Sequence, residues 1–160
     1  MKILGLDTAT KTGWCLVDGG KVVESGVQDF AKRRGESNGL MFLRFRKWLD
    51  NLIDTARPEL LAYERAHHRG GAATEICVNL AGRVQEAAEA WNIECAAYHT
   101  SEIKRRATGK GGASKDEMVE AAAKLLGRPP LDDNEADACF IALLAHDECG
   151  VAGTLPPAMG

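Results

Sequence analysis

The opening of the chain, residues 1–17, has an acidic side chain at the end of an apolar strand. Residues 2–6 read KILGL, which is typical of a buried strand, and Asp7 follows at once. A turn of small and hydroxyl side chains, 8–10, then leads into a second strand at 14–17. A carboxylate at the end of a core strand is costly unless a positive group meets it. We therefore expect Asp7 to lie where a metal ion or a phosphate can approach.

The remaining sequence predicts a third strand and then an alternation of helices and strands. The pair Gly19-Gly20 is a hairpin signal, so the first three strands should form an antiparallel meander. The later order is helix, strand, helix, strand, helix, helix, which indicates a mixed five-stranded sheet with helices on both faces, an α/β fold. The predicted segments after the second strand are strand 21–28, helix 39–56, strand 60–64, helix 74–91, strand 93–98, and two helices opened by capping boxes at 114–117 and 132–135.

Length and composition indicate one globular domain. The chain has 160 residues, of which 45% are apolar and 27% charged, enough for one sizeable core. Its apolar runs are shorter than the roughly 18 residues that span a membrane. Because the first strand begins at residue 2, we expect no signal peptide. The five cysteines form no C-x-x-C pair, which favours reduced thiols in a cytoplasmic protein. We expect a domain over 1–147 and a flexible tail over 148–160.

Two further acids can join Asp7. Glu64 also ends an apolar strand, and if the two strands are parallel neighbours their carboxylates lie side by side at the carboxyl ends. Asp137 lies one turn into the last helix within an apolar run, and Asp133 and Asn134 fall within about 60° of it around the helix. Each acid alone also fits a structural role in a turn, at a strand end or in a first helical turn.

Together these acids predict metal-dependent chemistry. Clustered carboxylates repel one another unless a cation joins them, and ligands that are all oxygen select hard ions such as Mg²⁺ or Mn²⁺. Two such ions about 3.5–4 Å apart activate a water and stabilise the leaving oxygen in phosphodiester hydrolysis.

Positive charge is concentrated in two segments, although the net formal charge is −3. One is the loop 65–73, and the other is the stretch 100–113, where glycines let the backbone approach a duplex. Lys115 follows at a helix start, where the helix dipole disfavours a cation, so a role beside a phosphate is favoured over a solvated loop. The candidate DNA-contacting residues are His67, His68, Arg69, Lys104, Arg105, Arg106, Lys110 and Lys115.

Four motifs cover the chain to about His146: GLDTATKTGW at 5–14, LAYERA at 61–66, SEIKRRATGKGGASK at 101–115 and EADACFIAL at 135–143. In this order they resemble the RuvC Holliday-junction resolvases of the RNase H-like nuclease superfamily. The small size and short loops are similar to those of phage or prophage members. The resemblance implies an RNase H-like domain and a homodimer, with helix 74–91 at its interface. It further implies a protein that binds a four-way DNA junction and nicks two strands symmetrically with Mg²⁺ or Mn²⁺.

Carried over by motif, the resemblance makes Asp7, Glu64 and Asp137 the catalytic acids and metal ligands. The family's fourth ligand lies three residues before the last acid and is usually aspartate, whereas this chain has Asn134. Asparagine offers a carbonyl oxygen without a charge, so either Asn134 or the neighbouring Asp133 completes the metal site.

Two further roles follow from the resemblance. An aromatic wedge of the family falls on His67, with His68 beside it, and histidine stacks on a base less strongly than phenylalanine or tyrosine. Lys115 would place its ammonium beside the scissile phosphate and so counts among the catalytic residues.

Three other functions compete with junction resolution. An actin-like kinase has a similar first phosphate-binding turn, but it needs two such domains and 160 residues are too few. An RNase H-like nuclease for other branched DNA, flaps or RNA–DNA hybrids is a nearer alternative. A catalytically weak dimeric DNA-binding protein is the third, and Asn134 is its one indication. The sequence identifies no helicase partner.

Overall fold

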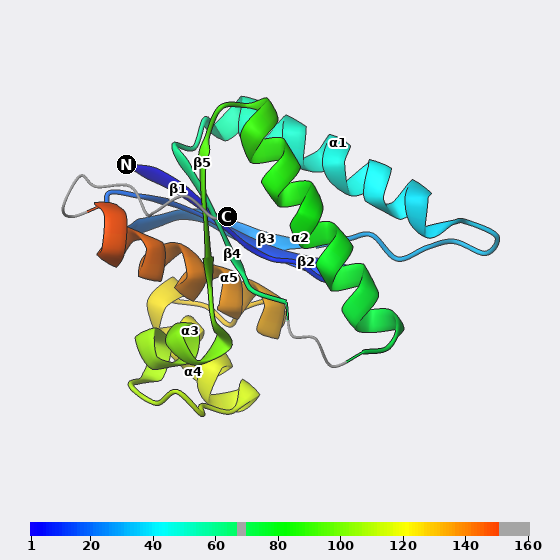
Figure 1. The fold of residues 1–160 in the computed structure, drawn as a ribbon. Coiled ribbons are helices and arrows are strands. Elements are labelled where there is room, and N and C mark those ends of the chain that lie inside the picture. Colours follow the sequence, from blue (N-terminus) through cyan, green and yellow to red (C-terminus); the bar gives the residue numbers. More distant parts are fainter. Residues whose placement is uncertain (67–69, 151–160) are drawn as a thin grey trace.

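The strands form one mixed sheet in the part of the chain that the computed structural model describes, residues 1–66 and 70–150. They are β1 (Lys2–Asp7), β2 (Lys11–Asp18), β3 (Lys21–Asp29), β4 (Leu60–Glu64) and β5 (Glu94–Tyr98). The first three are antiparallel, whereas β4 pairs parallel to β1 and β5 parallel to β4, in the order β3-β2-β1-β4-β5 (Figure 1). Gly19 and Gly20, both with positive φ, form the turn between β2 and β3. The predicted five-stranded mixed sheet is confirmed.

Helices cover both faces of this sheet, as the order of elements predicts (Figure 1). They are α1 (Asn38–Ala56), α2 (Ala72–Ala90), α3 (Thr100–Thr108), α4 (Lys115–Leu126) and α5 (Asp133–Ala145), followed by a π-helical turn, His146–Gly150. Because side chains alternate along a strand, Leu4 and Leu6 of β1 face the core formed with α1 and α2, whereas Ile3 faces the core formed with α3, α4 and α5. No helix among the described residues is long and apolar enough to cross a membrane.

The basic stretch after β5 contains a helix that the sequence analysis does not predict. Its first half forms α3, which the Glu102 carboxylate caps by accepting a hydrogen bond from the His99 N–H at 3.0 Å. Gly109, with φ of 82°, ends the helix. Only Ile103 of α3 is buried, so this helix is too short and too polar to show an apolar period.

Two glycines let α5 lie directly against the backbone of the sheet. A Cβ atom at Gly13 would lie 1.9 Å from the carbonyl oxygen of Asn134, and one at Gly5 would lie 2.5 Å from that of Ala138. Gly13 is also the β2 residue opposite Asp7 in β1. The first turns of α5 therefore lie over the end of β1, at the level of Asp7.

The start of α5 differs in part from the capping box predicted at 132–135. Asp132 caps the helix as predicted, accepting a hydrogen bond from the Glu135 N–H at 2.9 Å. Glu135, however, is fully buried, and its carboxylate accepts hydrogen bonds from the Arg128 guanidinium, the Leu131 N–H and the Ser25 hydroxyl. Burial alone would raise the pKa of Glu135, but these partners outweigh it and leave the pKa below its ordinary value. This network fastens the α4–α5 connection to β3.

Other helix ends lie where the sequence predicts them. Ser37 caps α1, a capping box of Ser114 and Glu117 opens α4, and Gly127 ends α4 in a left-handed conformation. The cysteines at 15, 77, 95, 139 and 149 are all free in the described structure. The predicted tail lies outside the described residues from 151 onward, and the domain boundary at 147 stays a prediction.

Candidate active site

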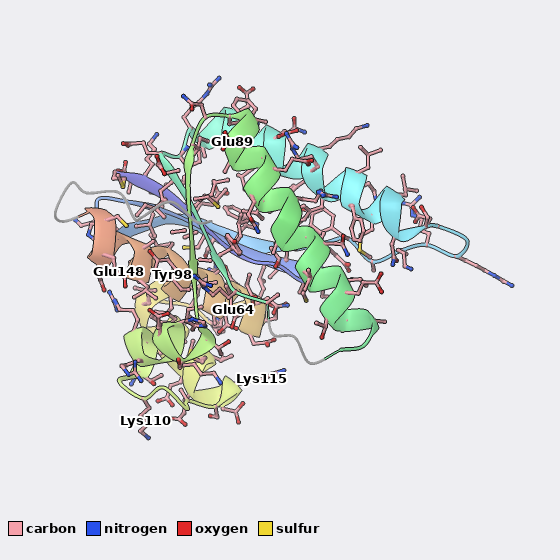
Figure 2. All side chains as sticks on the ribbon, viewed as in Figure 1. Glu64, Glu89, Tyr98, Lys110, Lys115 and Glu148 are labelled. Atoms are coloured by element: carbon pink, nitrogen blue, oxygen red, sulfur yellow. The ribbon has the colours of Figure 1, made fainter. Side chains whose placement is uncertain are left out.

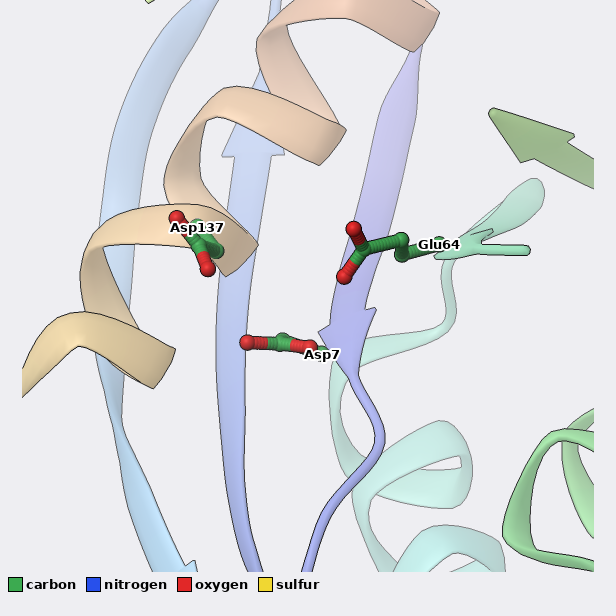
Figure 3. Close-up of side chains that lie close together, drawn as sticks. All are labelled: Asp7, Glu64 and Asp137. Carbon is green, nitrogen blue, oxygen red and sulfur yellow. The ribbon is translucent and has the colours of Figure 1, made fainter. Parts of the chain in front are cut away.

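Three carboxylates from distant parts of the sequence meet at one edge of the sheet. Asp7 ends β1, Glu64 ends β4, and Asp137 comes from the second turn of α5 (Figure 3). One ligand oxygen from each side chain lies within 4.8 Å of the others. Within residues 1–66 and 70–150, this is the only group of three or more histidine, cysteine or acidic side chains close enough to hold a metal ion.

The sheet and the glycines together explain why these side chains meet. Leu6 of β1 pairs with Tyr63 of β4, so Asp7 and Glu64 are the next residues on two parallel neighbours and leave the sheet at the same edge. Because Gly13 has no side chain, α5 can lie close to that edge of the sheet, and this brings Asp137 near the other two acids.

Burial and mutual repulsion disfavour negative charge in this group. Burial raises the pKa of Asp7 well above its ordinary value, and the charges of Asp137, Glu64 and Asp133 raise it further. Burial likewise raises the pKa of Asp137 to about 7, with added repulsion from Glu64 and Asp133. The donor set is all oxygen and gains from a positive partner, so these residues fit a hard divalent cation.

The acids open onto a cavity of about 270 Å³. The turn after β1 forms one wall, and the buried Thr12 fixes its shape by donating a hydrogen bond from its hydroxyl to the Ala9 carbonyl at 2.7 Å. The other described residues that line the cavity are Thr8, Arg65, Ala66, Cys77 and Asn134. The cavity is therefore polar on the acid side and bounded by the start of α2 on the other.

The two candidates for a fourth ligand have different surroundings. Asn134 lines the cavity, and its amide nitrogen donates to the Lys11 carbonyl at 2.8 Å, which leaves the amide oxygen for other partners. Asp133 is not among the described residues that line the cavity; its carboxylate lies 3.6 Å from the Lys115 ammonium. The Asp133 charge nevertheless acts on both Asp7 and Asp137.

The candidate DNA-contacting side chains that the structure describes project from α3, α4 and the loop between them. Lys104 is near enough to the acids for its positive charge to lower the pKa of Asp137, although burial and the neighbouring acids raise that pKa more strongly. Arg106 pairs with Asp147, and Lys110 pairs with Glu117 at 3.4 Å. Lys115 is 85% exposed and is seen with Lys110 at the α3–α4 end of the molecule (Figure 2). Arg105 is also exposed, while His67, His68 and Arg69 lie outside the described residues.

Two residues near the acids were missed in the sequence analysis. The Thr100 hydroxyl donates a hydrogen bond to Glu64, and Cys77 of α2 lines the cavity with its carbonyl 3.5 Å from the Thr8 hydroxyl. Thr100 follows β5, which is parallel to the Glu64 strand, so its position in the chain was a usable signal. Cys77 lies three residues before the buried Leu80, which puts it on the face of α2 that turns toward the sheet.

Comparison with known proteins agrees with the resemblance of the sequence motifs. The family model described as crossover junction endodeoxyribonuclease RuvC matches residues 3–146. A RuvC of Prochlorococcus marinus subsp. pastoris is 30% identical over 157 residues, covering 94% of this chain and 99% of the relative. A RuvC of Brachyspira hyodysenteriae is 31% identical over 152 residues, covering 91% and 93%.

Solved structures show the same fold. The structure of Thermus thermophilus RuvC in complex with a Holliday junction substrate aligns with a TM-score of 0.80 at 24% identity, covering 96% of this chain and 97% of that one. The yeast mitochondrial Holliday junction resolvase aligns with a TM-score of 0.62 at 15% identity, covering 89% and 76%. The predicted RNase H-like architecture is confirmed by these likenesses. With a family model that matches nearly its whole length, this chain belongs to the crossover junction endodeoxyribonuclease RuvC family.

Proposed function

We propose that this protein is a metal-dependent endonuclease that resolves four-way DNA junctions by paired, symmetric nicks. The observation that carries the proposal is the meeting of Asp7, Glu64 and Asp137 at one edge of the sheet in a chain of the RuvC family. Relatives about 30% identical over most of this chain bear the name crossover junction endodeoxyribonuclease.

The three acids would hold divalent cations, Mg²⁺ or Mn²⁺, with two ions per site. Asn134 suits the fourth ligand position because it lines the cavity, while Asp133 contributes negative charge at the margin. When bound, such ions polarise the scissile phosphate and lower the pKa of the attacking water. Burial favours the protonated forms of Asp7 and Asp137, so both carboxyl groups would release their protons when they bind a metal ion.

The basic side chains would orient the DNA backbone over the acids. Lys104 acts on Asp137 through its charge, so a phosphate drawn to this lysine lies close to the site. Lys115 has one described acidic partner, Asp133, and its long exposed stem lets the ammonium move to a scissile phosphate.

Paired nicks require two active sites, which a homodimer supplies. We place the interface on α2 and its neighbour α1, because exposed apolar side chains are found on both helices. Leu40 and Leu43 of α1 are 40% and 51% exposed, and Val78 of α2 is 38% exposed.

We further propose a cytoplasmic location, where the free thiols would stay reduced.

A second candidate activity is cleavage of other branched DNA, flaps or RNA–DNA hybrids. It is favoured by one feature of the sequence, the weakly stacking His67 at the position of the family's aromatic wedge. This residue lies outside the described structure.

The test is a cleavage assay read at nucleotide resolution. A mobile four-way junction, a flap and an RNA–DNA hybrid are each incubated with the protein in Mg²⁺ and in Mn²⁺. We expect symmetric nicks in the junction with both ions, and we expect the Asp7→Asn variant to bind the junction without cutting it. Faster cleavage of the flap or hybrid would favour the second candidate, and the absence of metal-dependent cleavage would refute both.

A further inference from the structure

A hydroxyl group outside the three carboxylates contacts one of them directly. Thr100, the first residue of α3, donates a hydrogen bond from its Oγ1 to Oε1 of Glu64. Thr100 is half-buried and is not among the described residues that line the cavity. Any effect of this hydroxyl on a bound ion would therefore pass through the Glu64 carboxylate.

The parallel pairing of two strands fixes this contact. Glu64 at the end of β4 lies opposite Tyr98 at the end of β5, and the Arg65 N–H donates to the Tyr98 carbonyl at 2.8 Å. Two residues beyond Tyr98 the chain enters α3 with Thr100. The hydroxyl is thus held by the sheet and by the start of a capped helix, and it presents a fixed donor to Glu64.

Glu64 is the acid of the group that most needs such a donor. A glutamate has one more side-chain torsion than an aspartate, so more rotamers compete with the one that faces the cavity. The Thr100 hydroxyl, held at the start of α3, restrains the Glu64 side chain from outside the cavity. A donor on one carboxylate oxygen leaves the second oxygen free to serve as a ligand.

We propose that Thr100 is a positioning residue that holds the Glu64 carboxylate where a divalent cation can join it to Asp7 and Asp137, a role that rests on the proposed function. Groups that hydrogen-bond to metal ligands typically change metal affinity by about 10–100-fold. Lys104 lies one turn further along α3 and acts on Asp137 through its charge. The position of α3 therefore affects two of the acids, Glu64 through Thr100 and Asp137 through Lys104.

The experiment compares Mn²⁺ binding by the DNA-free protein and its variants, followed by the electron paramagnetic resonance signal of free Mn²⁺. Thr100→Val removes the hydroxyl and keeps the shape of the side chain, and Thr100→Ala removes it without the crowding of a β-branched residue. Thr100→Ser keeps the hydroxyl. Ser101→Ala, which removes an exposed hydroxyl from the same helical turn, is the matched control.

We expect the dissociation constant for Mn²⁺ to rise about tenfold or more in Thr100→Val and Thr100→Ala. It should stay near the wild-type value in Thr100→Ser and in Ser101→Ala. In junction cleavage, saturating Mn²⁺ should return the kcat of Thr100→Val toward that of the wild type, because the defect lies in holding the ion. A residue that only stabilises the fold would lower the melting temperature without this recovery.

Wild-type Mn²⁺ affinity in both Thr100→Val and Thr100→Ala would overturn the positioning role, as would a Thr100→Ser variant no better than Thr100→Val. If the variants lose Mn²⁺ affinity as expected but the wild type cuts no junction, the positioning role stands and the proposed function fails. A wild-type protein that binds no Mn²⁺ would overturn both.

Discussion

At the scale of single residues, the acid group is a compromise between folding and function. Asp7 and Asp137 are buried next to each other, and burial with repulsion raises both pKa values, that of Asp137 to about 7. Without a cation, ionisation of these groups works against the folded state. The same oxygens form the donor set of the proposed metal site, and a divalent ion bound there would offset this cost.

This compromise predicts how the stability of the metal-free protein depends on pH. The folded-state pKa of Asp137 lies above its ordinary value of 3.8, so the folded state binds more protons between about pH 4 and pH 7. The free energy of unfolding should therefore fall as pH rises through this window. Asp137→Asn should flatten the slope and raise stability at pH 8 by roughly 1–3 kcal/mol.

Urea denaturation in the presence of a chelator at pH 5, 7 and 8 measures this dependence. Addition of Mn²⁺ at pH 8 should stabilise the wild type more than the variant, because the ion removes the repulsion. An identical pH slope in the wild type and Asp137→Asn would contradict the raised pKa.

Asn134 gives a second prediction at this scale. Asn134→Asp puts a fourth carboxylate on the cavity wall and also removes the N–H that the Lys11 carbonyl accepts. We expect a lower melting temperature without metal, because a charge is added beside three acids, and several-fold tighter Mn²⁺ binding. Thermal melts with chelator and a Mn²⁺ titration test both effects. Weaker Mn²⁺ binding by Asn134→Asp would show that this position does not contribute a ligand.

The acids could be predicted from the sequence because each one interrupts or ends an element with a clear apolar pattern. Asp7 and Glu64 follow apolar strands, and Asp137 interrupts an apolar helix, so their convergence needed only the strand order. Thr100 and Cys77 were missed although their positions, after a parallel strand and on the buried face of a helix, were usable signals, because threonine and cysteine are ordinary residues there. Their importance comes from contacts across the molecule, Thr100 with Glu64 and Cys77 with the cavity.

At the scale of elements, the start of α5 depends on an ion pair in which only the carboxylate is buried. Glu135 is fully buried, and Arg128, whose side chain is 45% exposed, lies 2.6 Å from it. The pair spans the connection between α4 and α5, two residues before Asp137. Through Ser25 it also ties the start of the helix that carries the third acid to β3.

Arg128→Ala should destabilise the protein by roughly 2–4 kcal/mol, because it leaves the Glu135 carboxylate buried with fewer partners. Lys124→Ala, which removes an exposed i,i+4 pair with Glu120, is the control and should cost under about 1 kcal/mol. Chemical denaturation at pH 7 measures both values. A cost for Arg128→Ala no larger than for Lys124→Ala would show that Glu135 is held by Leu131 and Ser25 alone.

Elements with a strong apolar period could be predicted, whereas those held by a few specific contacts could not. α1 and α2 bury regular apolar stripes, and their predicted limits differ from the observed ones by at most two residues. α3 was missed because it buries only Ile103 and depends on capping by Glu102. The burial of the Glu135 side chain was missed because its partner Arg128 follows the end of α4, where the sequence predicts an exposed arginine.

At the scale of the whole molecule, the sheet order separates two layers with different tasks. The layer of α1 and α2 carries three exposed apolar side chains, Leu40, Leu43 and Val78. The layer of α3 to α5 carries Asp137, the basic side chains and one exposed leucine, Leu125. The overall sheet could be predicted because β2 and β3 are joined by a Gly-Gly turn and the later strands alternate with helices, as parallel strands do. A homodimer stays a prediction that rests on the resemblance, since three scattered exposed apolar residues do not form a readable pattern.

The dimer interface proposed on α1 and α2 can be tested with a charge. Val78→Glu, on α2, should dissociate the dimer, since a buried carboxylate at an interface is costly. Leu125→Glu, at a similarly exposed position on α4, is the control and should leave the dimer intact. Sedimentation velocity measures the oligomeric state. A wild-type monomer, or a Val78→Glu variant that sediments as a dimer, would refute this interface.

The contact of α5 with Gly5 and Gly13 has a consequence for how such a protein can vary. At Gly5 and Gly13 the helix approaches main-chain atoms of the sheet, so its distance from the sheet at these two points is not set by a large side chain. Exchanges of apolar residues elsewhere in the core can then accumulate without moving Asp137 away from Asp7. A chain with this contact could therefore exchange many apolar core residues and still hold these two acids at the same spacing.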